Sequence, residues 1–140
     1  MSARSKARKQ ALDLLYETDI RGTNLLETLV ARDIPADGPD ARPIREYTRE
    51  LVNGVSDNRR KIDELITTYA QGWDMDRMPV LDRNILRLSI FELLWSKSVP
   101  EAVAISEALE LATYFSTEDS SKYINGVLSK VLEIKPDLVL

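Results

Sequence analysis

The sequence has 140 residues, a length typical of one domain, and a chain of this size buries roughly two thirds of its unfolded surface without needing disulfides. It contains no cysteine and no histidine, which excludes thiolate chemistry and removes the commonest general base and metal ligand. The formal net charge is −4, yet four cations lie within the first ten residues, so the rest of the chain is markedly acidic.

The N-terminal residues carry no secretory or lipid-anchor pattern. The basic residues are followed by an amphipathic pattern rather than an apolar run, and residue 2 is Ser instead of the Gly that myristoylation requires. We therefore expect a cytoplasmic protein with no membrane partner.

The first part of the chain is predicted to form two helices followed by a break. One helix is expected from about Ser5 to Ile20, with Gly22 marking its end. Asn24, with Glu27 three residues later, has the pattern of a capping box and predicts a short second helix. The segment Ile34–Pro43 contains three prolines and a glycine, which indicates a loop or hinge.

Two more helices are expected between this loop and residue 70. The first has apolar residues at helical spacing, namely Ile44, Tyr47, Leu51 and Val55. Ser56 or Asp57 can cap the second. Its expected buried face consists of Ile62, Leu65, Ile66 and Tyr69. A turn-rich connector, Gln71–Met78, follows.

The segment Pro79–Trp95 is predicted to be the central helix of the fold. Its apolar side chains leave no broad polar face, so other parts of the protein must enclose it. It is shorter than the roughly 20 apolar residues of a membrane span, and charged residues interrupt it. Asp82, Arg83 and Arg87 either pair internally or face a partner, and their spacing slightly favours internal pairing.

Two helices complete the predicted all-α fold. Pro100 opens the first, whose apolar stripe consists of Ile105, Ala108, Leu109, Ala112 and Phe115. Ser116 or Thr117 caps the last one, which Pro136 ends, and capping explains Glu118 and Asp119 better than a catalytic carboxylate pair does. The apolar face of this last helix consists of Ile124, Val127, Leu128 and Val131. Gly54 and Gly126 lie inside helical patterns, where we expect them to permit close helix crossings.

The basic N-terminal segment is the main candidate for a binding site. It consists of Arg4, Lys6, Arg8 and Lys9. Cations at the start of a helix oppose the helix dipole, and a phosphate ligand would reverse that preference. A phosphate-binding segment and a merely solvated tail are about equally consistent with the residues. No aromatic residue lies between the cations, so Tyr16 and Tyr123 are the candidates for base stacking.

No pattern in the sequence indicates an enzyme, a cofactor or a metal site. Asp74 and Asp76 begin like a calcium loop, but Met78 and Pro79 occupy positions where an oxygen ligand and the turn glycine belong. No glycine-rich phosphate loop, hydrolase elbow or kinase motif is present. Trp73 and Trp95 are expected to pack in the core rather than to form a stacking platform.

Four segments together resemble the NusB transcription antitermination family, and its actinobacterial members in particular. They are ARSKARKQALDLLYE, LDRNILRLSIFELL, VPEAVAISEALELA and STEDSSKYINGVLSKV. The resemblance implies about seven helices, arranged as two three-helix sub-bundles around the central helix, and a non-enzymatic role. It also implies binding, with the ribosomal protein NusE, to the single-stranded boxA element of ribosomal RNA leader transcripts. That complex would help RNA polymerase resist premature termination.

The resemblance also implies which residues make contacts. RNA would be bound by Arg4, Lys6, Arg8, Lys9, Asp119, Lys122 and Tyr123, with the last three beside the first helix. Tyr16 and Asp82 match positions near the partner contacts, which moves Asp82 towards a partner-facing surface. On this interpretation Asp82→Lys reduces partner binding more than stability, and Arg8→Ala weakens boxA binding while leaving the fold intact.

Two other functions fit the same helical fold. One is the RNA-binding module of a ribosomal RNA methyltransferase, although the sequence holds no nucleotide-binding domain pattern. The other is a structural or regulatory homodimer that uses the surface otherwise available to partners.

Overall fold

The computed structural model describes residues 2–33 and 43–140, and these residues form only helices and their connections. The helices are α1 (Ala3–Arg21), α2 (Leu25–Arg32), α3 (Glu46–Tyr69), α4 (Val80–Trp95), α5 (Glu101–Phe115), α6 (Glu118–Ile134) and a short 3-10 helix (Lys135–Asp137). The all-α prediction is confirmed, with six α-helices in the described residues instead of about seven. Of the predicted loop Ile34–Pro43, only Pro43 lies within the described residues.

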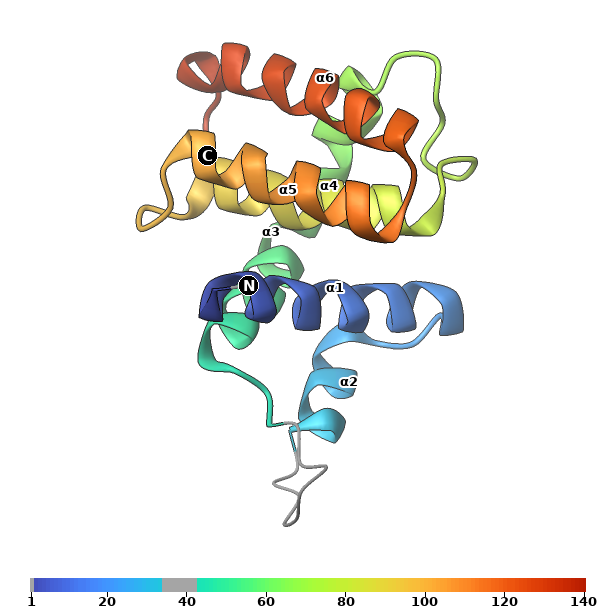
Figure 1. The fold of residues 1–140 in the computed structure, drawn as a ribbon, viewed down its shortest axis with the longest axis vertical. Helices are drawn as coiled ribbons and strands as arrows, with labels where there is room; N and C mark the ends of the chain where they lie inside the picture. The colour runs from blue at the N-terminus through green and yellow to red at the C-terminus, as the bar shows by residue number, and fades with distance from the viewer. Residues whose placement is uncertain (1, 34–42) are drawn as a thin grey trace.

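The helices pack in two groups of three that meet at α4. Helices α1, α2 and α3 contact one another, as do α4, α5 and α6. Figure 1 shows α5 between α1 and α6, with α3 extending behind from the lower group to the upper one. Helix α4 contacts α1, α3, α5 and α6, and it is therefore the element that joins the two groups.

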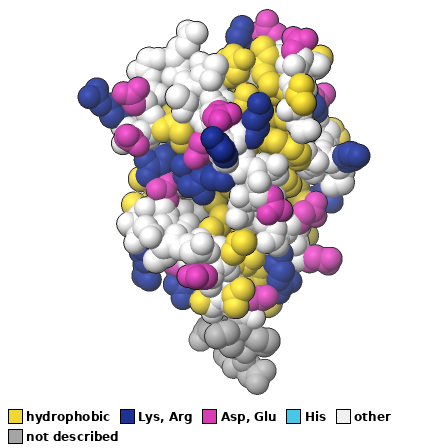
Figure 2. Space-filling view, turned by 180° about the vertical axis from the view of Figure 1, so that it is seen from behind, with side chains coloured by type: hydrophobic (Ala, Val, Ile, Leu, Met, Phe, Trp, Pro, Cys, Tyr) yellow, Lys and Arg dark blue, Asp and Glu magenta, His cyan; other side chains and the backbone are white. Residues whose placement is uncertain are grey.

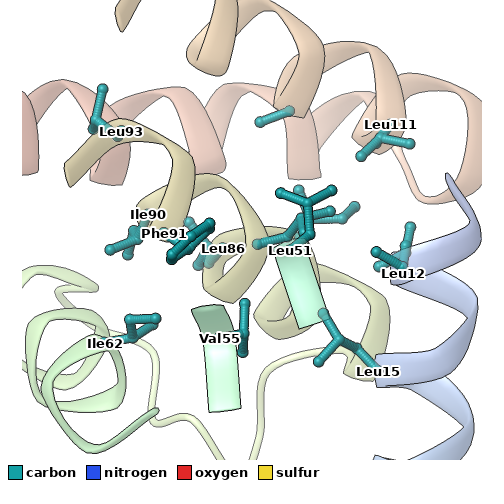
Figure 3. Close-up of a cluster of buried hydrophobic side chains, with 14 of the residues drawn as sticks. Leu12, Leu15, Leu51, Val55, Ile62, Leu86, Ile90, Phe91, Leu93 and Leu111 are labelled. Atoms are coloured by element: carbon teal, nitrogen blue, oxygen red, sulfur yellow. The ribbon is translucent and has the colours of Figure 1, made fainter. Parts of the chain in front are cut away.

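The central helix is enclosed, as its uniform apolar character predicts. Every residue from 84 to 94 is buried, the polar ones included. Figure 3 shows Leu86 and Phe91 of α4 beside Leu51 and Val55 of α3, with Leu12 and Leu15 of α1 and Leu111 of α5 in the same cluster on the other side of Leu51. Each fully buried aliphatic side chain contributes about 1.5–3 kcal/mol, so burial of this kind is the main stabilising term.

The segment 46–69 is one helix of 24 residues, and the prediction of two helices is wrong. Ser56 and Asp57 lie within α3 and cap nothing. No glycine or proline stands at these positions to end the helix, and the buried face continues from Val55 to Ile62, two turns later. A serine and an aspartate beside a continuous apolar face are therefore not sufficient to indicate a helix start.

Capping side chains explain where several helices begin. Asn24 accepts a hydrogen bond from the Glu27 amide at 3.0 Å, which confirms the predicted start of α2. Thr117 accepts one from the Ser120 amide at 3.0 Å and is the N-cap of α6. Ser2 caps α1 in the same way, so this helix begins two residues before the predicted Ser5.

The two helical glycines have different surroundings. A Cβ atom on Gly54 would lie 2.1 Å from the ring of Phe91, so α3 can approach α4 here only without a side chain. This confirms the predicted close crossing. Around Gly126 no atom lies within 4 Å of such a Cβ, and the packing role predicted for this glycine is wrong.

This contrast gives a matched pair of substitutions. Gly54→Ala is expected to lower the free energy of unfolding by about 1–3 kcal/mol, because the Phe91 ring must leave its position in a close-packed core. Gly126→Ala, in open space within α6, is expected to raise it by up to about 1 kcal/mol through helix propensity. Urea unfolding of both variants measures the difference. Equal stability of the two variants would contradict the close crossing.

Both tryptophans pack partly buried against the core, as predicted. Trp95 stacks on Phe91 with ring centroids 6.3 Å apart. Among the described residues, no helix has both the length and the apolar character to cross a membrane.

Candidate nucleic-acid interface

The cations of the first turns of α1 are divided between the surface and the interior. Arg4 and Lys6 are exposed and Lys9 is half-buried, whereas Arg8 is 2% exposed. Arg4 donates hydrogen bonds to the Ser98 carbonyl and hydroxyl, and its guanidinium lies 4.5 Å from the Tyr47 ring centroid. Three of the four predicted cations therefore reach solvent.

Arg8 belongs to a buried ion pair. Its Nε lies 2.8 and 3.0 Å from the two carboxylate oxygens of Glu92, which is 1% exposed. Tyr47 donates its hydroxyl to the same carboxylate, and Glu107 lies 3.4 Å from the guanidinium. Burial alone would lower the pKa of Arg8, but the hydrogen bond and charge of Glu92 raise it. The expectation that this guanidinium faces RNA is corrected, because it is buried and forms an ion pair with Glu92 inside the fold.

Asp82 is also interior, with no exposed surface. Its two carboxylate oxygens accept hydrogen bonds from the hydroxyls of Ser116 and Ser120, both at 2.7 Å. The first turn of α6 and the residue before its N-cap thus cover the side chain. The expected partner-facing position of Asp82 is wrong, and its role is to join α4 to the corner between α5 and α6.

The other charged residues of α4 pair internally, as their spacing favours. Arg83 contacts both carboxylate oxygens of Asp19 at 2.6 and 2.7 Å, and Arg87 contacts Asp19 at 3.0 Å and Asp63 at 2.9 Å. Burial alone would raise the pKa of Asp19, but hydrogen bonds from Arg83 and Asn84 and the arginine charges lower it to about 2. These bonds connect α1 and α3 to α4.

The face opposite to the view of Figure 1 carries mixed charge. Figure 2 shows Lys and Arg side chains there beside Asp and Glu, with hydrophobic side chains between them. Because acids lie beside these cations, the two signs of charge partly neutralise one another on the described part of this face.

Two of the predicted site residues of α6 reach the surface. Asp119 and Lys122 are exposed on the first turns of α6. Helix α5 lies between α6 and α1 in the view of Figure 1, and the expectation that this segment sits beside the first helix stays a prediction. The candidate surface consists of Lys9 on α1, Phe115 at the end of α5, and the exposed Asp119 and Lys122 at the start of α6.

Tyr123 is only partly available for stacking. Its ring packs edge-on against Trp73 with centroids 4.7 Å apart, and its hydroxyl is buried with no described hydrogen-bond partner. Burial, and then the charge of Asp82, raise the pKa of this hydroxyl. Tyr16 is 41% exposed on α1 and is the freer of the two predicted aromatic residues.

Two aromatic residues at the end of α5 were missed as site residues. Tyr114 is 75% exposed and Phe115 is 38% exposed, although Phe115 was assigned to the buried stripe. The Lys9 ammonium lies 4.7 Å from the Phe115 ring centroid, which places both aromatics beside the basic segment. The available signal was their adjacency just before a helix cap, because neighbouring residues of a helix point in different directions and cannot both face the core.

Within residues 2–33 and 43–140, no three Asp or Glu side chains are grouped so that they could hold a metal ion. Asp74 and Asp76 are both exposed in the connector before α4.

A protein-family model described as the NusB family matches residues 5–133. The chain belongs to the NusB family. The "Transcription antitermination protein NusB" of Leifsonia xyli subsp. xyli (strain CTCB07) is 51% identical over an alignment of 140 positions. The alignment covers 97% of this chain and 95% of that protein. This confirms the resemblance to actinobacterial members.

Solved structures of NusB proteins share the fold. "T. maritima NusB" superposes with a TM-score of 0.80 at 31% identity, covering 98% of this chain and 99% of that one. The NusB chain of "Crystal Structure of Antitermination Factors NusB and NusE in complex with dsRNA" gives 0.74 at 29% identity, covering 93% and 96%. Membership of the NusB family makes this chain a transcription antitermination factor and not an enzyme.

Proposed function

We propose that this NusB-family chain binds the boxA element of ribosomal RNA leader transcripts together with NusE, and so helps RNA polymerase resist premature termination. The observation that carries the proposal is that Arg4 and Lys6 are exposed at the start of α1, while the Lys9 ammonium lies over the exposed Phe115 ring that ends α5. A relative of known structure was crystallised with NusE and dsRNA, which supports both kinds of partner.

The mixture of cations and exposed rings favours single-stranded RNA. Cations supply affinity for any phosphate backbone, whereas exposed aromatic rings can bind only bases that have left a duplex. Three surface cations are few for tight binding without help. NusE would therefore extend the binding surface, and Asp119 and Lys122 on α6 would complete it on this side.

An exposed apolar area on the second half of α1 is the proposed contact for NusE. Tyr16 and Ile20 are 41% and 58% exposed and lie one helical turn apart. Neither helps to hold the core, whereas apolar and aromatic side chains of this kind form the centres of protein interfaces. Sedimentation with and without NusE separates this heterodimer from the homodimer alternative.

Binding to RNA is expected to depend on salt. With three phosphate contacts, log K falls with log salt at a slope of about −2, because each contact on a single strand contributes roughly −0.7. Lys6→Ala removes one contact and reduces the slope by about 0.7. Fluorescence anisotropy with a boxA-containing RNA and a scrambled RNA, with and without NusE, measures affinity and slope together.

The control for this titration is Lys130→Ala, which removes an exposed cation near the other end of α6. Its slope should equal that of the unmodified protein. A flat salt dependence, or equal affinity of the NusE complex for boxA and scrambled RNA, would contradict the proposed function.

A further inference from the structure

We propose that Tyr114 and Phe115, together with Lys9, form a stacking site for one unpaired base of the bound RNA, with Tyr114 as its outer ring. The inference rests on the proposed function and names a contact that the cations alone do not provide. It assigns the base to the end of α5 instead of to Tyr123.

The exposure of Tyr114 is the first reason. Three quarters of this side chain faces solvent, and its hydroxyl makes no hydrogen bond with any other described residue. Its ring lies 6.4 Å from that of Phe115 at an interplanar angle of 52°. The two rings thus form an apolar ledge that contributes little to the core and leaves ring surface open to a ligand.

The position of Lys9 is the second reason. Its ammonium lies over the Phe115 ring at 4.7 Å and 2.5 Å from the Asp13 carboxylate, at the inner edge of the ledge. A nucleotide bound there would place its phosphate towards this cation and towards Lys6, one turn earlier in α1. Base and phosphate then contact different groups, as in other single-strand sites.

The hollow beside the ledge is the third reason, because its chemistry suits a base better than a phosphate. Its polar and aromatic lining residues are Ser2, Ser5, Glu107, Glu110, Tyr114 and Phe115, and Leu111 also lines it. The carboxylates would repel a phosphate, whereas a base is neutral and the amino groups of adenine, cytosine and guanine can donate to a carboxylate. Glu107 already accepts a hydrogen bond from Ser5 and pairs with Arg8, so Glu110 is the freer acceptor.

The test compares Tyr114→Ala and Tyr114→Phe in the complex with NusE, using a fluorescent single-stranded boxA RNA and a scrambled strand of the same length. Tyr114→Ala is expected to weaken binding of both strands about 5- to 100-fold, and Tyr114→Phe to stay within about twofold of the unmodified protein. The salt slope should be the same in all three proteins, because no phosphate contact is removed.

The control is Val103→Ala, which truncates another exposed apolar residue on the same helix and should leave RNA affinity and melting temperature unchanged. Tyr114→Ala should have the same melting temperature as the control, since the Tyr114 side chain is outside the core. Unchanged affinity in Tyr114→Ala, or an equal loss in Tyr114→Phe, overturns the stacking site while leaving the proposed function in place. Failure of the unmodified complex to bind RNA would instead overturn the proposed function.

Discussion

Arg8→Ala is expected to lower the free energy of unfolding by about 3–5 kcal/mol, because it leaves the Glu92 carboxylate buried without its cation. A domain of this kind has a total stability of about 5–15 kcal/mol, so the variant should unfold at a clearly lower urea concentration. Circular dichroism during urea titration measures the change. This replaces the expectation, drawn from the sequence, that the substitution leaves the fold intact.

Lys6→Ala is the matched control for that experiment. It removes a cation from the same helix turn, but the side chain is exposed, so the change should stay within about 0.5 kcal/mol. If Arg8→Ala were as stable as Lys6→Ala and lost RNA affinity, the guanidinium would have to be available to RNA after all. The RNA affinity of Arg8→Ala must therefore be measured without urea, at a temperature where the variant is folded, because an unfolded protein would lose affinity for another reason.

Asp82→Lys is expected to be more damaging still, with a loss above about 4 kcal/mol. The substitution puts an ammonium with no acid partner into a site that has no exposed surface, and it deprives Ser116 and Ser120 of their acceptor. The milder Asp82→Asn keeps the shape of the side chain and should lose about 1–3 kcal/mol. Thermal and urea unfolding of both variants test this order.

Asp119→Asn provides the comparison, because it neutralises an exposed acid in the first turn of the adjoining α6 and should change stability by no more than about 0.5 kcal/mol. An Asp82→Lys protein that kept its stability and lost only NusE binding would restore the partner-facing position. The expected result instead shows that Asp82 fixes the position of the start of α6, where Asp119 and Lys122 lie.

Local signals in the sequence predicted most of the helices, because caps and breaks act over three or four residues. Asn24 and Thr117 accept the hydrogen bonds that their side chains predict, and Pro79 and Pro100 stand immediately before α4 and α5. Helix α3 was divided wrongly because Ser56 and Asp57 are also compatible with a helix interior. Whether such a pair caps a helix depends on the packing of the face beside it.

Composition and periodicity alone therefore determined that this chain is all-helical, that Pro79–Trp95 is enclosed, and that a basic segment opens the first helix. Only the tertiary structure decided which of those cations reach solvent, because Arg8 differs from its neighbours by an acid 84 positions away, Glu92. It also brought Phe115 next to Lys9 and buried Asp82 beneath two serines. Burial of a charge depends on partners supplied by other helices, and spacing within one helix does not contain that information.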